Sequence, residues 1–354
     1  MDKNEIKIRP KIAIIVDVEG WAYHNNALEI QKRLNKYYDI DIIPVTIFGD
    51  NIVKIFIIGL KYDLMFFMWR ANISWLYSDF SKKYIEEIGY TFNEFIKKFV
   101  KDRNIVTGVY DHLFLNEEKE RTKFILENVK DYIVSSNKLK NIYNDSYQKK
   151  PSFVITDGVD LNLFKMKNKD KYLKVKENKE MKIGWTGNSK FTDESGDDLK
   201  GLQKVIKPAI QELQDEGYKI KLEIADRNIK LIPHSEMPKY YENIDIYICA
   251  SRTEGTPDTV LEAMACGIPI ISTDVGIVTD VFGEKQSKYI IKRNKDDLKE
   301  KIKKLINNPK ELNELSKENL ERIKKYSWDC QSEKFKKFIE KNLKKGEENE
   351  KKQR

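Results

Sequence analysis

The sequence of 354 residues predicts an α/β protein made of two doubly wound domains that face each other across a cleft. Short apolar runs alternate with amphipathic stretches, the pattern of parallel strands joined by helices that cover both faces of a sheet. The alternation stops in a polar, lysine-rich stretch at 163–180 and then restarts. A hydrophobic fraction of 40% is sufficient for two cores of ordinary size.

In the first half, apolar runs predict strands and periodic stretches predict helices. The predicted strands lie at 12–16, 64–69, 105–110, 132–135 and 153–156. A helix is expected from about 27 to 37. The clearest helix runs from 84 to 100, where apolar side chains recur at every third or fourth position.

The second half repeats this alternation. Its predicted strands lie at 182–186, 219–225, 244–250, 268–272 and 289–291, with a helix at about 199–216. Thr256 and Pro257 predict the start of a short helix, because threonine is a good N-cap and proline needs no N–H donor at the first helical position. The expected segments are a first domain at 1–165, a linker at 166–180, a second domain at 181–328, a helix at 329–345 and a frayed tail at 346–354.

Composition excludes several classes of protein. The net charge of +8 comes largely from C-terminal lysines that are mixed with glutamates, as on a solvated helix. Because no zinc spacing or RNA-binding signature accompanies this charge, nucleic acid is not expected as a partner. A weak peripheral contact with an anionic membrane stays open.

The same composition indicates a cytoplasmic protein. No apolar run is long enough to span a bilayer, and the first residues lack the apolar core of a signal peptide. Three cysteines are too few and too scattered for a disulfide framework. We therefore expect a reducing compartment, with the inner face of the membrane as a further place of action.

The most informative motif is a pair of glutamates, Glu254 and Glu262, separated by seven residues. The predicted short helix starts between them, so its free N–H groups and its dipole would attract a phosphate. Two carboxylates around one anion site fit the handling of a nucleotide-linked substrate. No Asp-x-Asp pair stands in a setting that suggests a metal site.

These residues resemble a known family. The segment 234–251, the Glu254–Glu262 block and its Ala-Met-Ala-Cys-Gly continuation at 263–267 look like the C-terminal domain of the retaining GT-B glycosyltransferases of family 4, the glycosyl transferases group 1. Gly184-Trp-Thr-Gly187 and Lys200-Gly201 add to the likeness. The C-terminal half resembles the family nearly throughout. The N-terminal half resembles it mainly in the order of predicted strands and helices, and at a few positions.

The resemblance implies the GT-B fold and transfer of a sugar, with retention of anomeric configuration, from a nucleoside-diphosphate sugar that is UDP- or GDP-linked. The acceptor would be a glycan, a lipid carrier or a protein, in the synthesis of a cell-surface polysaccharide or glycoconjugate. It implies no metal and no cofactor besides the donor substrate. The second domain would hold the donor, the first domain the acceptor, and the helix at 329–345 would return to the first domain.

The resemblance also implies roles for individual residues. Glu254 and His112 are the expected catalytic residues, with Glu254 beside the donor sugar and His112 near a distant hydroxyl of that sugar. Glu262 is expected to bind the ribose hydroxyls and Lys200 the phosphates. The other expected donor-binding residues are Gly255, Thr256, Asp258, Thr259, Gly187, Asn188, Lys190, Arg227 and His234. Gly20 and Trp21 are the expected loop for the phosphates and acceptor.

One departure from the family pattern leaves an alternative open. Asn188 stands where the family usually has an arginine, so Lys190 and Arg227 are the candidates for the second phosphate-binding cation. The alternative to an enzyme is a GT-B-fold scaffold or partner subunit of an active glycosyltransferase. A dehydrogenase is not supported, because no Gly-x-Gly-x-x-Gly follows the first predicted strand.

Overall fold

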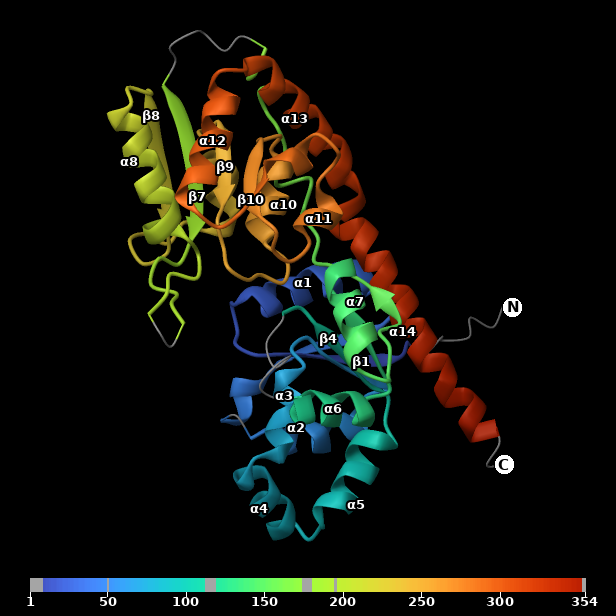
Figure 1. Ribbon diagram of the computed structural model, residues 1–354. Helices are drawn as coiled ribbons and strands as arrows, with labels where there is room; N and C mark the ends of the chain where they lie inside the picture. The colour runs from blue at the N-terminus through green and yellow to red at the C-terminus, as the bar shows by residue number, and fades with distance from the viewer. Residues whose placement is uncertain (1–8, 50, 112–118, 174–179, 194–195, 352–354) are drawn as a thin grey trace, which may run out of the picture. The chain divides into compact units, whose positions relative to one another are not determined.

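The computed structural model describes residues 9–49, 51–111, 119–173, 180–193 and 196–351 (Figure 1). The chain forms two compact units. Unit 1 consists of Met1–Thr156 together with Gln331–Arg354, and unit 2 consists of Asp157–Cys330. Each unit contains one fully parallel sheet with helices between its strands, which confirms the predicted α/β class.

Unit 1 is built on a six-stranded sheet in the order β2-β1-β3-β4-β5-β6. The chain turns back at β1, since β2 lies on one side of it and β3 on the other, so β1 and β3 flank the switch point. The strands are β1 (Lys11–Val16), β2 (Asp39–Pro44), β3 (Leu64–Phe67), β4 (Ile105–Val109), β5 (Asp131–Val134) and β6 (Phe153–Val154).

The helices of unit 1 cover this sheet and are mostly short. They are α1 (Ala22–Leu34), η1 (Val45–Phe48), α2 (Ile52–Ile58), η2 (Gly59–Lys61), α3 (Ala71–Ser74), η3 (Trp75–Tyr77), α4 (Asp79–Glu87), α5 (Phe92–Ile96), η4 (Lys97–Lys101), α6 (Lys119–Asn128), α7 (Asn137–Ser146) and α14 (Trp328–Lys351), which begins in unit 2.

The prediction of one continuous helix at 84–100 is wrong. The chain forms α4 and then α5, because Gly89 adopts a left-handed φ of 85° and ends the first helix. Thr91 then starts a new helix through a capping box with Glu94. The apolar period continues across this break, so periodicity alone could not reveal it.

Two further boundaries differ from the prediction. The helix expected at about 27–37 is α1, which begins at Ala22 and ends at Leu34. The edge strand β2 was not predicted as a strand, since aspartates at 39 and 41 interrupt its apolar pattern. Charged residues are common on edge strands because they discourage pairing with another chain.

The C-terminal helix is tied to unit 1 by polar and aromatic contacts. Lys341 Nζ and Asn342 Nδ2 lie 2.7 and 3.3 Å from Asp131 Oδ2, at the start of β5. Phe335 and Phe338 pack their rings against Phe66 of β3, with centroids 5.8 and 6.2 Å apart. The helix therefore belongs to the core of unit 1 rather than to a free tail.

Unit 2 contains a five-stranded parallel sheet in the order β11-β10-β9-β7-β8. Its central strands are almost completely buried, as expected for a parallel sheet covered on both faces. The strands are β7 (Met181–Gly187), β8 (Ile220–Asp226), β9 (Ile246–Cys249), β10 (Ile270–Thr273) and β11 (Ile290–Ile291).

The helices of unit 2 include the short α10 that was predicted between the two glutamates (Figure 1). They are η5 (Leu202–Ile206), α8 (Lys207–Asp215), η6 (His234–Glu236), α9 (Met237–Glu242), α10 (Asp258–Ala265), α11 (Val278–Val281), η7 (Gln286–Tyr289), α12 (Lys295–Ile306), α13 (Pro309–Arg322) and η8 (Ile323–Tyr326).

The predicted starts of two of these helices need correction. Helix α10 begins at Asp258, with Pro257 as its N-cap and no side-chain cap, so Thr256 is not the capping residue. The helix expected from about 199 begins at Leu202, because Gly201 has a left-handed φ of 75°. Lys200 therefore lies in a loop rather than within the helix.

Candidate functional site

The predicted phosphate-binding lysine and the predicted catalytic glutamate form an ion pair in unit 2. Lys200 Nζ lies 2.6 Å from Glu254 Oε1, and about a fifth of each side chain is exposed, at 25% and 16%. Burial by itself would lower the pKa of Lys200, but the charge and hydrogen bond of Glu254 outweigh it and raise this pKa. A permanently charged, half-buried ammonium group therefore stands beside Glu254, where it can bind an anion.

The loop that carries Lys200 is fixed by its neighbours. Gly201 lies so close to β9 that an added Cβ would stand 2.3 Å from the carbonyl oxygen of Ala250. Asp198 accepts hydrogen bonds from four backbone N–H groups, those of Lys200, Gly201, Gln203 and Lys204. The start of this helix is thus occupied by a carboxylate of the chain itself, while the Lys200 side chain is directed at Glu254.

The second glutamate of the motif is buried and held on both oxygens. Glu262 Oε2 accepts a hydrogen bond of 2.7 Å from the hydroxyl of Tyr241, and its Oε1 lies 2.9 Å from His234 Nε2. His234 is itself exposed and rests against the ring of Phe164, with centroids 5.1 Å apart. These contacts fix the carboxylate of Glu262, and its remaining lone pairs can accept hydroxyl donors.

Two aspartates lie beneath the loop between the glutamates. Asp157, at the start of unit 2, is 4% exposed and accepts a hydrogen bond from Thr256. Among the described residues, Asp157 Oδ1 and Asp258 Oδ1 are both buried without a hydrogen-bond partner. Burial raises the pKa of Asp157 to about 7. Burial and then the charges of Asp157, Glu262 and Glu254 raise the pKa of Asp258 well above its ordinary range.

The raised pKa of Asp258 bears on how an anion could approach α10. An ionised carboxylate at the first position of this helix would repel a diphosphate. Burial and the neighbouring carboxylates raise the pKa of Asp258 and so favour its neutral form, which reduces this repulsion.

The buried acid Asp157 should make the stability of the protein depend on pH. Its pKa rises from the ordinary 3.8 to about 7 in the folded protein, so the folded state binds more protons than the unfolded state between these values. The free energy of unfolding then falls as the pH rises through this window. Asp157→Asn removes this effect, so its stability relative to wild type should increase by about 2.5 kcal/mol from pH 5 to pH 8.

Urea denaturation at both pH values measures this difference. The exposed Asp170 provides the matched control, because Asp170→Asn makes the same chemical change outside the buried pair. A stability difference between Asp157→Asn and wild type that stayed constant from pH 5 to pH 8 would contradict the raised pKa.

The two cations proposed to replace the family arginine lie apart from this pair. Lys190 is exposed in the loop after β7, and Arg227 is exposed directly after β8. Arg227 N–H donates to the carbonyl of Gly187, and Asn188 accepts from the N–H of Lys190, so Gly187 and Asn188 shape the loop through these bonds. No side-chain contact of Lys190 or Arg227 with Lys200 or Glu254 occurs within the described ranges.

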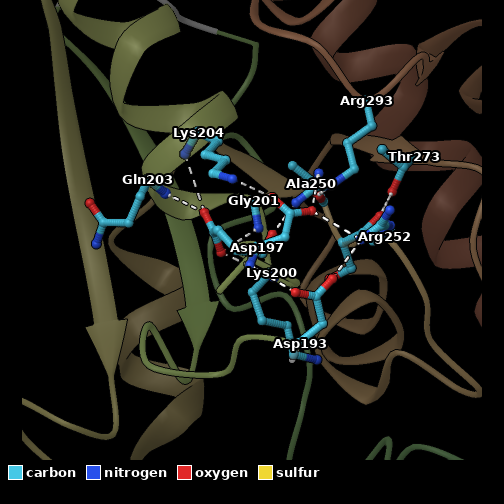
Figure 2. Close-up of polar contacts among 12 residues, drawn as sticks. Asp193, Asp197, Lys200, Gly201, Gln203, Lys204, Ala250, Arg252, Thr273 and Arg293 are labelled. Carbon is cyan, nitrogen blue, oxygen red and sulfur yellow. Dashed lines mark hydrogen bonds and ion pairs between the residues drawn. The ribbon is translucent and has the colours of Figure 1, made fainter. Parts of the chain in front are cut away.

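Sequence reasoning did not select Arg252, which the structure places beside the ion pair. Figure 2 shows its guanidinium against Asp193, and Arg252 Nη1 lies 2.8 Å from Asp193 Oδ2 and 3.1 Å from Asp197 Oδ2. Arg252 lies two residues before Glu254 in the same loop. This closeness in the sequence could have marked it as a candidate site residue, because the loop that positions Glu254 also positions its neighbours.

The remaining predicted residues have structural roles or lie in unit 1. The carbonyl oxygen of Gly255 lies so near Gly276 that a Cβ added to Gly276 would stand 2.0 Å from it. The carbonyl oxygen of Thr259 lies 3.3 Å from the hydroxyl of Tyr241, farther than the Glu262 carboxylate to which this hydroxyl donates. Gly20 adopts a φ of 78° after β1, and Trp21 is 55% exposed at the start of α1. His112 lies outside the described residues. In the part of the chain that is described, no three His, Cys, Asp or Glu side chains are grouped to hold a metal ion.

An ion pair, a fixed carboxylate and a helix terminus beside a parallel sheet therefore lie together in unit 2, and the lysine of the pair could bind an anion. Residues 210–322 match the model of the family described as glycosyl transferases group 1, and this segment contains Glu254, Glu262, His234 and Arg227. This segment is thus similar to the glycosyl transferases group 1 family, and the chain as a whole has the GT-B fold.

Comparisons with individual proteins agree with this assignment. The chain is 37% identical over 81 residues to the lipopolysaccharide core biosynthesis mannosyltransferase LpsB of Rhizobium meliloti, which covers 22% of each chain. It is 31% identical over 129 residues to the GtfA subunit of a UDP-N-acetylglucosamine–peptide N-acetylglucosaminyltransferase of Streptococcus pneumoniae, covering 34% of this chain and 25% of that one. These matches span about a quarter of the length of the curated relatives.

A solved structure shows the same fold over nearly the whole chain. A sucrose-phosphate synthase from Thermosynechococcus elongatus superposes with a TM-score of 0.65 at 15% identity, covering 94% of this chain and 99% of the other. Separately, no helix among the described residues has the length and apolar character needed to cross a bilayer.

Proposed function

We propose that the chain is a retaining, metal-independent glycosyltransferase that moves a sugar from a UDP- or GDP-linked donor to a glycan, lipid-carrier or protein acceptor. The observation that carries the proposal is the 2.6 Å pair of Lys200 and Glu254 beside the start of α10, with the fixed carboxylate of Glu262 in the same helix. The family of the matched segment supports it.

The chemistry of the site fits the breaking of a sugar–phosphate bond. The bond between the anomeric carbon and the phosphate oxygen would break, an acceptor hydroxyl oxygen would bond to the same carbon, and the hydroxyl proton would pass to the departing diphosphate. Negative charge then grows on the departing nucleoside diphosphate, so a fixed cation aimed at it lowers the barrier. Lys200 would supply this cation, Glu254 would contact the donor sugar, and Glu262 would accept hydrogen bonds from the ribose hydroxyls.

The cellular setting is proposed from the named relatives. LpsB is a mannosyltransferase of lipopolysaccharide core biosynthesis, and the GtfA subunit belongs to an enzyme that acts on a peptide. Both names support a place in the synthesis of a cell-surface polysaccharide or glycoconjugate. We place this reaction in the cytoplasm, at the inner face of the membrane where a lipid-linked acceptor is used.

Turnover of a donor by the purified chain tests this function. The protein is incubated with a panel of UDP- and GDP-linked sugars, without and with glycan, lipid-linked and peptide acceptors, and the released UDP or GDP is measured. We expect release above the uncatalysed rate with one donor, stimulated by its acceptor, and a product that keeps the anomeric configuration of the donor by NMR. A panel in which no donor is bound or consumed would contradict the proposal.

A catalytically weak scaffold or partner subunit is the second candidate. The name of the GtfA relatives, which are subunits, favours it, as does Asn188 in place of the family arginine. Such a protein would bind a nucleoside diphosphate without turnover and would raise the activity of a second glycosyltransferase. Tight donor binding with no release of the nucleotide, even with acceptor present, distinguishes it from an enzyme.

A further inference from the structure

The segment between β7 and Lys200 brings two carboxylates to Arg252. This segment turns back on itself, with Asp193 Oδ1 accepting from the N–H of Asp197 at 2.8 Å. The other oxygen of Asp193 and Oδ2 of Asp197 both hold Arg252 Nη1 (Figure 2). The guanidinium is therefore held on a pair of acids that the local backbone has already positioned.

Arg252 is adjacent to the proposed donor site through its backbone. Its N–H donates to the carbonyl of Leu199 at 2.9 Å, so Arg252 and Glu254 run alongside Leu199 and Lys200. The side chain of Arg252 is 55% exposed, compared with 25% for Lys200. Arg252 is thus an exposed cation on the segment that pairs with Leu199 and leads to Glu254.

Arg293 and Lys204, which both pair with Asp197, differ from Arg252. Arg293 donates through Nε to the carbonyl of Ala250 and through Nη2 to that of Asp198, so it is fixed to the backbone. Lys204 Nζ is bonded to Asp197 Oδ1 at 2.6 Å and projects from the outer helix η5. Arg252 alone of these three follows β9 into the loop that contains Glu254.

We propose that Arg252 is the second cation for the diphosphate of the donor and fills the role left open by Asn188. Asp193 and Asp197 hold it in the unliganded protein, and phosphate oxygens replace them when the nucleoside diphosphate binds. A guanidinium group is suited to this exchange, since its planar donors bind carboxylate and phosphate in the same geometry. This inference rests on the proposed function, because the ligand is the donor of that reaction.

The exchange is energetically reasonable. An exposed ion pair such as that of Arg252 and Asp193 stabilises a protein only weakly, because water screens the two charges. A charge-assisted hydrogen bond to a phosphate in a partly buried site contributes more. The acids therefore orient Arg252 without preventing it from binding the donor, and they lower the affinity for the diphosphate by competing with it.

Calorimetric titration with UDP, GDP and the nucleosides uridine and guanosine tests the inference. Arg252→Gln should weaken binding of the preferred diphosphate about 10-fold or more, and Arg252→Lys less. Asp193→Asn should tighten it about 2- to 5-fold, and this gain should vanish when Arg252→Gln is also present. Binding of the nucleoside should stay unchanged in all variants, which a general distortion of the site would not allow.

A surface lysine provides the control, and the variants distinguish failure of the Arg252 proposal from failure of the proposed function. Lys285 pairs with Glu314 at 2.6 Å on the surface, so Lys285→Gln makes a similar loss of charge elsewhere and should leave binding as in wild type. If Lys200→Gln weakens diphosphate binding and Arg252→Gln does not, the role of Arg252 is overturned while the proposed function stands. If the wild-type protein binds neither UDP nor GDP, both fall.

Discussion

Replacing Glu254 by glutamine should lower kcat/KM for sugar transfer by about 10²- to 10³-fold, the usual loss when one preorganised electrostatic contact of an active site is removed. Glutamine keeps the shape of the side chain but removes the charge that pairs with Lys200 at 2.6 Å. Lys200→Ala should produce a loss of the same size, because the departing diphosphate then lacks its cation. Initial rates of nucleotide release with varied donor measure both effects.

A second ion pair, on the protein surface, provides the control for this experiment. Glu314 and Lys285 also stand 2.6 Å apart, but both side chains are about half exposed and lie outside the site. Glu314→Gln should therefore leave kcat/KM unchanged. Rates for Glu254→Gln within a few-fold of wild type, with the folded state intact, would remove Glu254 from the proposed chemistry.

The second large effect concerns stability. Gly201→Ala should destabilise the protein by about 3 kcal/mol or more, since it combines a strained left-handed backbone with overpacking. The φ of Gly201 is 75°, and an added Cβ would meet the Ala250 carbonyl at 2.3 Å and the Ala250 Cβ at 2.7 Å. Neither atom can move without displacing β9. Urea denaturation gives the free energy of unfolding.

The variant Gly217→Ala separates the cost of backbone strain from the cost of overpacking. It also has a left-handed φ, of 91°, but no atom lies within 4 Å of the position that an added Cβ would take. Gly217→Ala should cost only the backbone strain, about 1 kcal/mol. Equal losses for the two variants would show that the close approach of Gly201 to β9 contributes nothing.

The sequence was sufficient for the fold class because the patterns that decide it are local. Buried parallel strands are continuous apolar runs, and all ten predicted strands overlap strands of the two sheets. What it could not show were breaks that leave the apolar period intact, as at Gly89, and strands whose pattern charged residues interrupt, as in β2.

For the site, the sequence predicted which residues carry charge but not which of them meet. Glu254 and Glu262 are close in the sequence, whereas Lys200 reaches Glu254 only through the pairing of strands β7 and β9. Asp157 and Arg252 were not selected, because neither belongs to a motif that spacing alone reveals. Their positions depend on how the loops at the ends of the strands fold together, which is a tertiary property.

A crystal structure of the protein with UDP or GDP bound would show whether Lys200 and Glu262 hold the donor nucleotide. We expect phosphate oxygens within hydrogen-bond distance of Lys200 Nζ, at the start of α10, and ribose hydroxyls on the carboxylate of Glu262. A nucleotide that bound at full occupancy elsewhere, with the pair of Lys200 and Glu254 undisturbed, would contradict it.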